Sequence, residues 1–385
     1  MTTPHFLQRL ALSFTVLIAS VAWSAPLVPP PPEIAAKSYV LMDAASGDVL
    51  AQHDGDTRLP PASLTKMMTA YIATLEMQRG RIHPGDMVTI SEKAWRTGGS
   101  KMFVEVGKQV SVDDLFHGII IQSGNDASIA MAEHIAGSED AFVSLMNAEA
   151  QRLGMRNTHF TDATGLPHPD HYSSAHDMAI LARAIINADP AHYAIYKQKY
   201  FLWNGINQPN RNLLLWRDDA VDGLKTGHTE EAGYCLVASA KRGNERLIAA
   251  VFGTDSEAAR AAETAKLLTY GFRFFDSRTF YNKGAVVTDV PVWKGAARSV
   301  KAGVNDVVAV SVAAGEADKL VALAIPKPTL IAPVKQGDVI GKVEIRAGDK
   351  VIKQVDLVAT ESVEQGGFFR RIWDSIRLFF RGLFG

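Results

Sequence analysis

A change of sequence pattern near residue 276 divides the chain into two parts that must fold differently. Before it, helix-like apolar spacing alternates with short strand-like runs, and after it valine-rich runs of roughly five to eight residues alternate with Gly, Pro and Asp turns. Short apolar runs bounded by turn residues are typical of an all-β unit. The 385-residue chain is therefore predicted to hold a mixed α+β unit followed by an all-β unit.

Apolar periodicity predicts the elements of both units. Short apolar runs on either side of Ala45-Ser46-Gly47-Asp48 favour a hairpin. Helices are expected at 63–79, 112–119, 126–136, 139–153, 175–187 and 255–275, and strands at 232–239 and 246–253. In the second unit, strands are expected at 285–290, 306–312, 319–325, 339–345 and 351–358.

Composition restricts the class of protein. Hydrophobic residues make up 47% and charged residues 21%, which excludes a disordered or collagen-like chain. Lysine plus arginine number 40 against 41 acids, so the net charge of -1 gives no reason to expect nucleic-acid binding. The single cysteine, Cys235, excludes an intramolecular disulfide and a cysteine-based zinc or iron–sulfur site. The apolar core must stabilise the fold, and Cys235 is expected to be a small residue of that core.

The first residues have the pattern of a secretory signal peptide. A short basic start precedes an apolar run at 10–21, and Ala22 and Ser24 provide small residues at a cleavage site. A membrane anchor is the alternative, but the run is shorter than the roughly 20 residues that span a bilayer. We expect a signal peptide at 1–24 and a proline-rich, extended linker at 25–36.

The last segment, 363–385, predicts an amphipathic helix. At about 100° per residue its apolar side chains cover an arc of about 160°, with four arginines and Asp374 opposite and only Leu378 out of place. A spanning helix would bury those charges, so a helix lying in the membrane interface is favoured over one that crosses the bilayer. Docking of the helix on its own domain is the alternative. The residues expected to contact lipid are Phe368, Phe369, Ile372, Trp373, Ile376, Phe379 and Phe380.

Three short motifs carry potential chemistry. In Ser63-Leu64-Thr65-Lys66, serine and lysine lie on one helical face about 5–6 Å apart, so a lysine that has lost its proton can act as base toward the hydroxyl. Ser123-Gly124-Asn125 precedes a helix, and Lys225-Thr226-Gly227 opens the strand-rich section. Each motif alone has an ordinary explanation as a turn, a cap or a close backbone approach.

Together and in this order, the three motifs are the signature of penicillin-binding proteins and serine β-lactamases. Their neighbourhoods resemble the low-molecular-mass D-alanyl-D-alanine carboxypeptidases, in a likeness that covers essentially the whole chain. The matching stretches are 62–69, 123–127, 153–160, 164–166 and 222–229. The resemblance implies a β-lactamase/transpeptidase-like catalytic domain at 37–275, with an antiparallel sheet flanked by helices. A smaller all-β domain at 276–362 and the terminal helix would follow.

The resemblance also implies the catalytic roles. Ser63 would be the nucleophile, acylated by the penultimate D-alanine while the terminal D-alanine leaves. Lys66 would be its general base, with a pKa lowered by burial beside the second cation Lys225. Ser123 would relay the proton to the leaving amine, and Asn125 would position Lys66 and the substrate amide.

Substrate binding is implied for four further groups. Lys225 and Thr226 would hold the terminal carboxylate, and Arg211 resembles a carboxylate-side arginine of the family. The backbone N–H groups of Ser63 and His228 would form the oxyanion hole.

No cofactor or metal is expected. His159, His168, His171 and His176 lie close together, but their spacing matches no recognised zinc motif.

Three other functions use part of the same evidence. A class A β-lactamase needs a glutamate between the second and third motifs, and the stretch 151–229 contains none. A long-lived penicilloyl adduct is therefore expected instead of rapid hydrolysis. A DD-endopeptidase would use the same residues, and a non-catalytic peptidoglycan-binding protein would not need the intact motifs. The expected partners are peptidoglycan stem peptides, β-lactams as covalent inhibitors and membrane lipid, on the outer face of the inner membrane in the periplasm.

Overall fold

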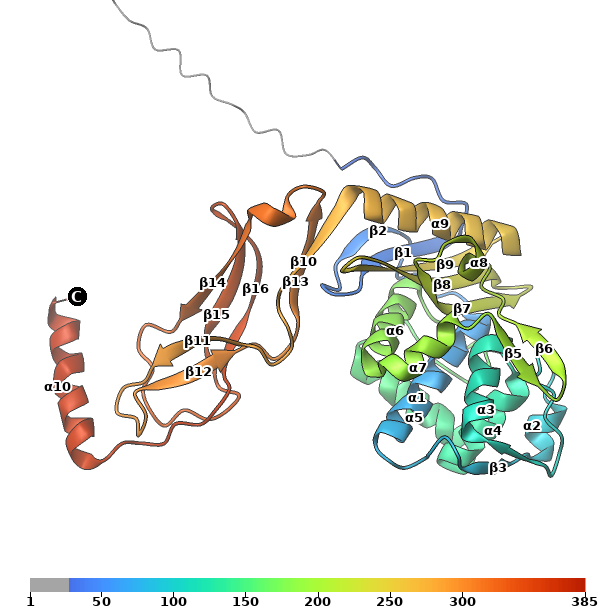
Figure 1. The fold of residues 1–385 in the computed structure, drawn as a ribbon, viewed down its shortest axis with the longest axis horizontal. Helices are drawn as coiled ribbons and strands as arrows, with labels where there is room; N and C mark the ends of the chain where they lie inside the picture. The colour runs from blue at the N-terminus through green and yellow to red at the C-terminus, as the bar shows by residue number, and fades with distance from the viewer. Residues whose placement is uncertain (1–27, 385) are drawn as a thin grey trace, which may run out of the picture.

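The computed structural model describes residues 28–384 of the chain (Figure 1). The predicted signal peptide, residues 1–24, lies outside this range. The described part of the proline-rich stretch forms no helix or strand and lies along helix α9 (Glu257–Phe274). The Tyr270 hydroxyl of α9 donates to the Pro29 carbonyl at 2.8 Å, and the Ala35 N–H donates to the Glu263 carboxylate at 3.2 Å.

The first unit is built on a five-stranded antiparallel sheet. Its strand order is β2-β1-β9-β8-β7, with the bounds β1 (Ser38–Asp43), β2 (Val49–His53), β7 (Val221–Thr229), β8 (Gly233–Arg242) and β9 (Glu245–Thr254). Side chains alternate between the two faces, so Leu41 packs toward α9 whereas Val40 packs toward the helical cluster. The predicted hairpin and the two predicted strands are confirmed, and β7 forms one edge of the sheet.

A cluster of helices covers the other face of the sheet (Figure 1). The longer ones are α1 (Lys66–Gln78), α4 (Asn125–Ala136), α5 (Glu139–Leu153) and α6 (Ala175–Ala188). The shorter ones are α2 (Glu92–Arg96), α3 (Val112–His117) and α7 (Pro190–Ala194), whereas α8 (Leu214–Arg217) packs on the α9 side of the sheet. Two predicted helices differ in detail. The first begins as a 3-10 turn over Ala62–Thr65, and α3 continues into a π turn over Gly118–Gln122.

Two short hairpins were not predicted. They consist of β3 (Met87–Thr89) with β4 (Gln109–Ser111), and of β5 (Tyr200–Trp203) with β6 (Ile206–Pro209). Strands of three or four residues are too short to show the alternation by which strands are recognised.

The second unit is all-β, as predicted. One sheet has the order β11-β12-β16-β15-β14, and a two-stranded ribbon joins β10 to β13. The bounds are β10 (Phe275–Tyr281), β11 (Val286–Pro291), β12 (Ser299–Gly303), β13 (Val308–Ala313), β14 (Leu320–Pro326), β15 (Val339–Ala347) and β16 (Lys350–Ala359). This unit has its own apolar core, around Val300, Ile345 and Leu357. The α+β catalytic fold with a smaller all-β domain is thus confirmed.

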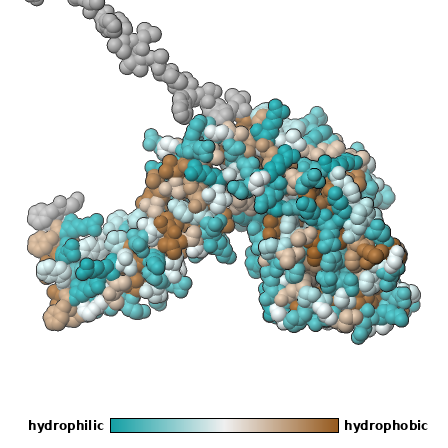
Figure 2. Space-filling model, in the orientation of Figure 1, coloured by the Kyte–Doolittle hydropathy of each residue, from teal (hydrophilic) through white to brown (hydrophobic). Residues whose placement is uncertain are grey.

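The terminal helix α10 (Phe368–Phe384) is present, and it contacts the β unit through its polar face. Asp374 accepts a hydrogen bond from the Lys294 N–H at 2.7 Å, and Arg370 donates to the carbonyls of Ala296 and Ala297 at 3.1 Å each. Leu378, the one apolar residue outside the predicted arc, is half-buried. Figure 2 shows apolar residues along the outer side of α10. None of the helices within residues 28–384 is both long and apolar enough to cross a membrane.

Candidate active site

The first motif forms a tight turn at the start of α1. Ser63 lies in the 3-10 turn, half-buried, and Lys66 is the first residue of the helix. Lys66 Nζ is 2.9 Å from Ser63 Oγ and donates to the Thr164 carbonyl at 2.6 Å. The sequence spacing therefore produces direct contact between the hydroxyl and the amine.

Two glycines allow other segments to pack directly against this turn. A Cβ atom on Gly227 of β7 would lie 2.9 Å from the Pro61 carbonyl oxygen, and one on Gly165 would lie 1.8 Å from the Ala62 oxygen. Gly165 also has a φ of +87°, which L-residues rarely adopt. The turn that carries Ser63, called the nucleophilic turn below after the expected role of Ser63, is thus held between β7 and the 160–171 loop.

Lys66 is only 1% exposed, and its environment favours the neutral amine. Burial lowers its pKa to about 7, assisted by the positive charge of Arg211, while the charges of Asp162 and Asp126 oppose the shift. Burial is the main cause of the shift, as expected. A substantial fraction of Lys66 is therefore neutral near pH 7, as a general base must be.

The second motif brings Ser123 and Asn125 to the end of the π turn and the start of α4. Ser123 has a φ of +66° and is 2% exposed. Within the described residues its hydroxyl is a buried oxygen without a hydrogen-bond partner. Asn125 donates to the Gly98 carbonyl at 2.7 Å and has no hydrogen bond to Lys66 among the described contacts. Lys66 instead donates to the Thr164 carbonyl.

The third motif lies on β7, at the edge of the sheet beside the nucleophilic turn. Lys225 is 3% exposed and donates to its neighbour's carbonyl, that of Thr226, at 3.1 Å. Burial lowers the pKa of Lys225 well below its usual value, and the nearby cations Lys66, Arg211 and Arg260 lower it further. Two lysines and two arginines therefore gather at this end of the site, and their mutual repulsion disfavours the charged form of the buried lysines.

The remaining predicted residues lie around this cationic end. Thr226 is buried, and the Arg211 guanidinium donates to the Ser100 hydroxyl at 2.8 Å. His228 is exposed, and its ring lies against that of Tyr234, tilted by 31° with ring centroids 4.0 Å apart. Cys235 is fully buried, as predicted, and burial raises the pKa of its thiol to about 11. Within residues 28–384, no group of His, Cys, Asp and Glu side chains is arranged to hold a metal ion.

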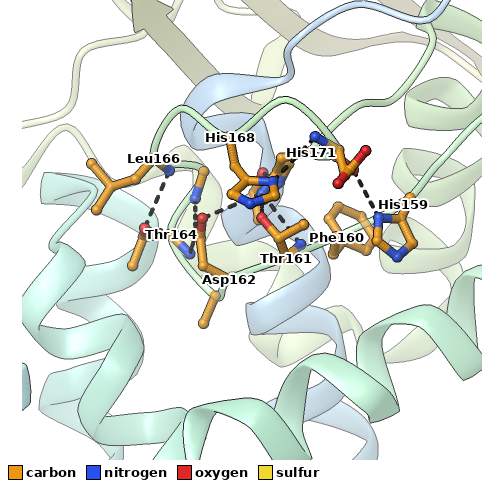
Figure 3. Close-up of polar contacts among 12 residues, drawn as sticks. His159, Phe160, Thr161, Asp162, Thr164, Leu166, His168 and His171 are labelled. Carbon is orange, nitrogen blue, oxygen red and sulfur yellow. Dashed lines mark hydrogen bonds and ion pairs between the residues drawn. The ribbon is translucent and has the colours of Figure 1, made fainter.

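Sequence reasoning missed the residues that support Lys66 from the 160–171 loop. Figure 3 shows Asp162, Thr164 and His171 joined by hydrogen bonds and an ion pair. Asp162 accepts from the N–H groups of the next residues, Thr164 and Gly165, at 2.6 Å each. An Asp followed closely by a glycine is a turn signal and could have identified this loop, although not its contact with Lys66.

Two family models match the chain, and their boundaries follow its two folded units. Residues 25–256 match D-alanyl-D-alanine carboxypeptidase (peptidase S11), and residues 275–365 match the penicillin-binding protein 5 C-terminal domain. The sequence is 44% identical to the D-alanyl-D-alanine carboxypeptidase DacC of Escherichia coli, over 97% of this chain and 95% of that relative. It is 43% identical to DacA of the same organism, over 99% and 98% of the two chains.

Solved structures show the same likeness. Penicillin-binding protein 5 from Haemophilus influenzae aligns with a TM-score of 0.81 and 43% identity, covering 88% of this chain and all of that one. Penicillin-binding protein D2 from Listeria monocytogenes, solved in its ampicillin-bound form, aligns with a TM-score of 0.59 and 28% identity, over 63% of this chain and all of that one. With these matches and an assembled Ser63–Lys66 pair, the chain belongs to the peptidase S11 family of D-alanyl-D-alanine carboxypeptidases.

Proposed function

We propose that Ser63 is the residue acylated during removal of the terminal D-alanine from peptidoglycan pentapeptide stems. The observation that supports this most strongly is the 2.9 Å contact between Ser63 Oγ and a buried lysine whose pKa is about 7. Neutral Lys66 takes the hydroxyl proton as Ser63 attacks the carbonyl carbon of the penultimate D-alanine. The backbone N–H groups of Ser63 and His228 receive the developing oxyanion.

The leaving D-alanine needs a proton on its amine when the peptide bond breaks. Ser123 has a buried hydroxyl with no partner among the described residues, so it is free to pass a proton to that amine. The proton that Lys66 removed from Ser63 is returned along this route. Asn125, whose side-chain amide donates to the Gly98 carbonyl at 2.7 Å, would orient the substrate amide from the start of α4.

The cationic end of the site accounts for selection of a C-terminal carboxylate. Lys225, Thr226 and Arg211 together offer charge and hydrogen-bond donors to a carboxylate. A bound carboxylate supplies the negative charge that Lys225 lacks in the free site, so binding raises the pKa of Lys225. The resulting ammonium group in turn favours the neutral form of nearby Lys66. Substrate binding therefore increases the fraction of Lys66 in the neutral form that can accept a proton.

The edge strand β7 is a template for an extended substrate backbone. Its partner on one side is β8, and among the described residues no strand pairs with its other edge. An extended peptide can add to such an edge through main-chain hydrogen bonds. This arrangement suits a linear stem peptide.

A β-lactamase is not supported, because no glutamate lies between residues 151 and 229 to activate a deacylating water. A DD-endopeptidase would use the same groups, and the carboxylate-binding cations favour a substrate with a free C-terminus. A non-catalytic peptidoglycan-binding role would not explain why the Ser63 hydroxyl contacts the Lys66 amine.

One experiment distinguishes the carboxypeptidase from a β-lactamase and from a non-catalytic binding protein. The mature protein is incubated with a pentapeptide ending in D-Ala-D-Ala and, separately, with a fluorescent penicillin, beside Ser63→Ala. We expect D-alanine release and a stable covalent label in the wild type and neither in the variant. A rapidly lost label would indicate a β-lactamase. Absence of any label would leave only the binding role.

We further propose that the protein is attached to the outer face of the inner membrane through α10. Its contacts with the β unit use polar groups, and seven apolar side chains are 44–84% exposed. These residues are Phe368, Phe369, Ile372, Trp373, Ile376, Phe379 and Phe380. An amphipathic helix with exposed aromatic residues and arginines fits the interface between lipid tails and anionic headgroups.

A further inference from the structure

The loop over residues 160–171, between α5 and α6, contains a polar network around Asp162, Thr164 and His171 (Figure 3). One carboxylate oxygen of Asp162 accepts three hydrogen bonds: from the Thr164 N–H at 2.6 Å, the Thr164 hydroxyl at 2.7 Å and the Gly165 N–H at 2.6 Å. These bonds fix the short turn whose Thr164 carbonyl accepts from Lys66 Nζ at 2.6 Å.

His171 connects the same carboxylate to the nucleophilic turn. Its Nδ1 lies 3.3 Å from the second oxygen of Asp162, and its Nε2 lies 2.8 Å from the Thr65 hydroxyl. The imidazole is 3% exposed, and the ring of Phe160 packs against it edge-on. Thr65 is the residue directly before Lys66. The network therefore contacts the backbone segment that carries Lys66 through Thr65, and the Lys66 amine through the Thr164 carbonyl.

The position of the amine matters because a neutral amine has one lone pair. With an N–H group anchored on the Thr164 carbonyl, the lone pair of Lys66 can be directed at the Ser63 hydroxyl. If the carbonyl shifts, the amine follows it, and a displacement of about 1 Å can cost 10²-fold in rate.

We propose that Asp162 and His171 form a positioning pair that fixes the Thr164 carbonyl, and through it holds Lys66 in the geometry for deprotonating Ser63. This inference rests on the proposed role of Lys66 as the general base. The pair acts through other groups and contacts neither substrate nor the reacting atoms.

The charges around the pair give it a second effect on Lys66. Burial would raise the pKa of Asp162, but the hydrogen bonds and charge of His171, with those from Thr164, outweigh burial and hold the pKa well below its usual range. Asp162 is thus ionised throughout the working pH range. Its charge raises the pKa of Lys66, as does that of Asp126 from α4, whereas burial and Arg211 lower it. Lys66 in turn lowers the pKa of Lys225 on β7.

The test compares two substitutions at Asp162 that remove different properties. Asp162→Asn keeps an oxygen able to accept from Thr164 and Gly165 but loses the charge. Asp162→Ala removes both the acceptor oxygen and the negative charge. The measured quantity is the rate constant of acylation by a fluorescent penicillin from pH 5 to 10, with the melting temperature of each variant. Asp170→Asn, an exposed carboxylate in the same loop, is the matched control.

We expect Asp162→Asn to move the acidic limb of the profile to lower pH by about one unit, because a charge that favours protonated Lys66 is gone. Asp162→Ala should in addition lower the rate at pH 9 by roughly 10- to 100-fold. Asp170→Asn should leave both the acidic limb and the acylation rate at pH 9 unchanged. A lower melting temperature for Asp162→Ala with a wild-type rate at pH 9 would show a merely structural role and overturn the proposal.

His171 is tested by combination with Asp162. Since both residues support one carbonyl, Asp162→Ala and His171→Ala together should slow acylation at pH 9 by less than the product of the single effects. If the double variant slows acylation by the full product of the two single effects, Asp162 and His171 act independently and the proposed pair is wrong. A wild type that is never labelled, or one whose labelling shows no acidic limb, would instead contradict the proposed function itself.

Discussion

At the scale of single residues, the site depends on two buried lysines with opposite tasks. In the proposed mechanism Lys66 has to be neutral to accept a proton, whereas Lys225 has to be cationic to hold a carboxylate. Burial lowers the pKa of both, so in the free site neither ammonium group is well stabilised. In the proposed mechanism, a substrate carboxylate bound directly to Lys225 stabilises the charge on Lys225 more than the charge on Lys66.

The lowered pKa of Lys66 predicts the pH dependence of acylation. Below about pH 7 the amine is protonated and cannot accept the Ser63 proton, so the rate should fall as pH falls and reach a plateau above pH 8. Stopped-time labelling with a fluorescent penicillin from pH 5 to 10 measures this. Lys66→Arg keeps the charge but cannot deprotonate, and should remain folded yet unacylated at every pH. Acylation of Lys66→Arg at the wild-type rate would rule out the base role.

The charge on Lys225 predicts selectivity for a free C-terminus. Wild type should prefer a peptide ending in a free acid over the same peptide with a C-terminal amide. Lys225→Ala should reduce kcat/KM for the acid by about 100-fold and change the amide much less, because it removes the partner of a buried charge. Lys241→Ala, which removes an exposed lysine from the neighbouring strand, is the control. Equal processing of acid and amide by the wild type would contradict this role.

The motif residues could be predicted because each motif is contiguous and the three occur in a recognisable order. Asp162 and His171 could not, because their importance depends on a loop that returns 98 residues later in sequence to meet Lys66. The spacing of residues in the sequence also does not indicate that the Thr164 carbonyl accepts a hydrogen bond from the Lys66 amine. Contacts of this kind appear only once the chain is folded.

At the scale of elements, the site exists because β7 and the 3-10 turn approach more closely than side chains would allow. Gly227 makes that approach possible, with three atoms of the turn within 3.3 Å of where its Cβ would be. Longer elements of this unit were predictable from apolar spacing. The 3-10 and π turns that carry Ser63 and lead into Ser123 were not, because both share the apolar pattern of an ordinary helix.

This close approach gives a prediction for Gly227→Ala. The added methyl group would press on the Pro61 carbonyl and the Leu64 side chain, moving β7 away from the nucleophile. Acylation should slow by roughly 10- to 100-fold, since the reacting groups lose alignment. Gly85→Ala, at a position with open space and no positive φ, is the matched control and should acylate normally. Wild-type acylation by Gly227→Ala would show that β7 does not set the geometry of the nucleophile.

At the scale of the whole molecule, the β unit is fixed to the side of the catalytic sheet by polar contacts. The Ser311 N–H donates to Asp48 at 3.1 Å, Lys353 donates to the Ser46 carbonyl at 3.3 Å, and the Ser277 N–H donates to Glu245 at 2.8 Å. The β unit thus connects the catalytic unit to α10 (Figure 1). The two-unit organisation was predictable from the change in pattern near residue 276, but these contacts between units were not.

The exposed face of α10 predicts how the protein is held at a membrane. Each aromatic side chain could contribute up to roughly 1.5–3 kcal/mol if fully buried, and partial insertion of several would be comparable to a lipid chain. Each arginine near anionic headgroups adds about 1 kcal/mol, a contribution that salt weakens. The apolar contribution should therefore dominate.

Sedimentation with anionic liposomes tests this prediction on the mature protein. Truncation before Gly366 should release a soluble protein that still cleaves small peptides, because every proposed catalytic and binding residue lies before Glu230. Replacing Phe369, Ile376 and Phe380 together with serine should detach the protein more completely than high salt does. The matched control replaces Val321, Leu323 and Ile325 on β14, which are also exposed, and should still sediment. If the truncated protein sediments with the liposomes as well, the membrane contact lies on the catalytic or β unit rather than on α10.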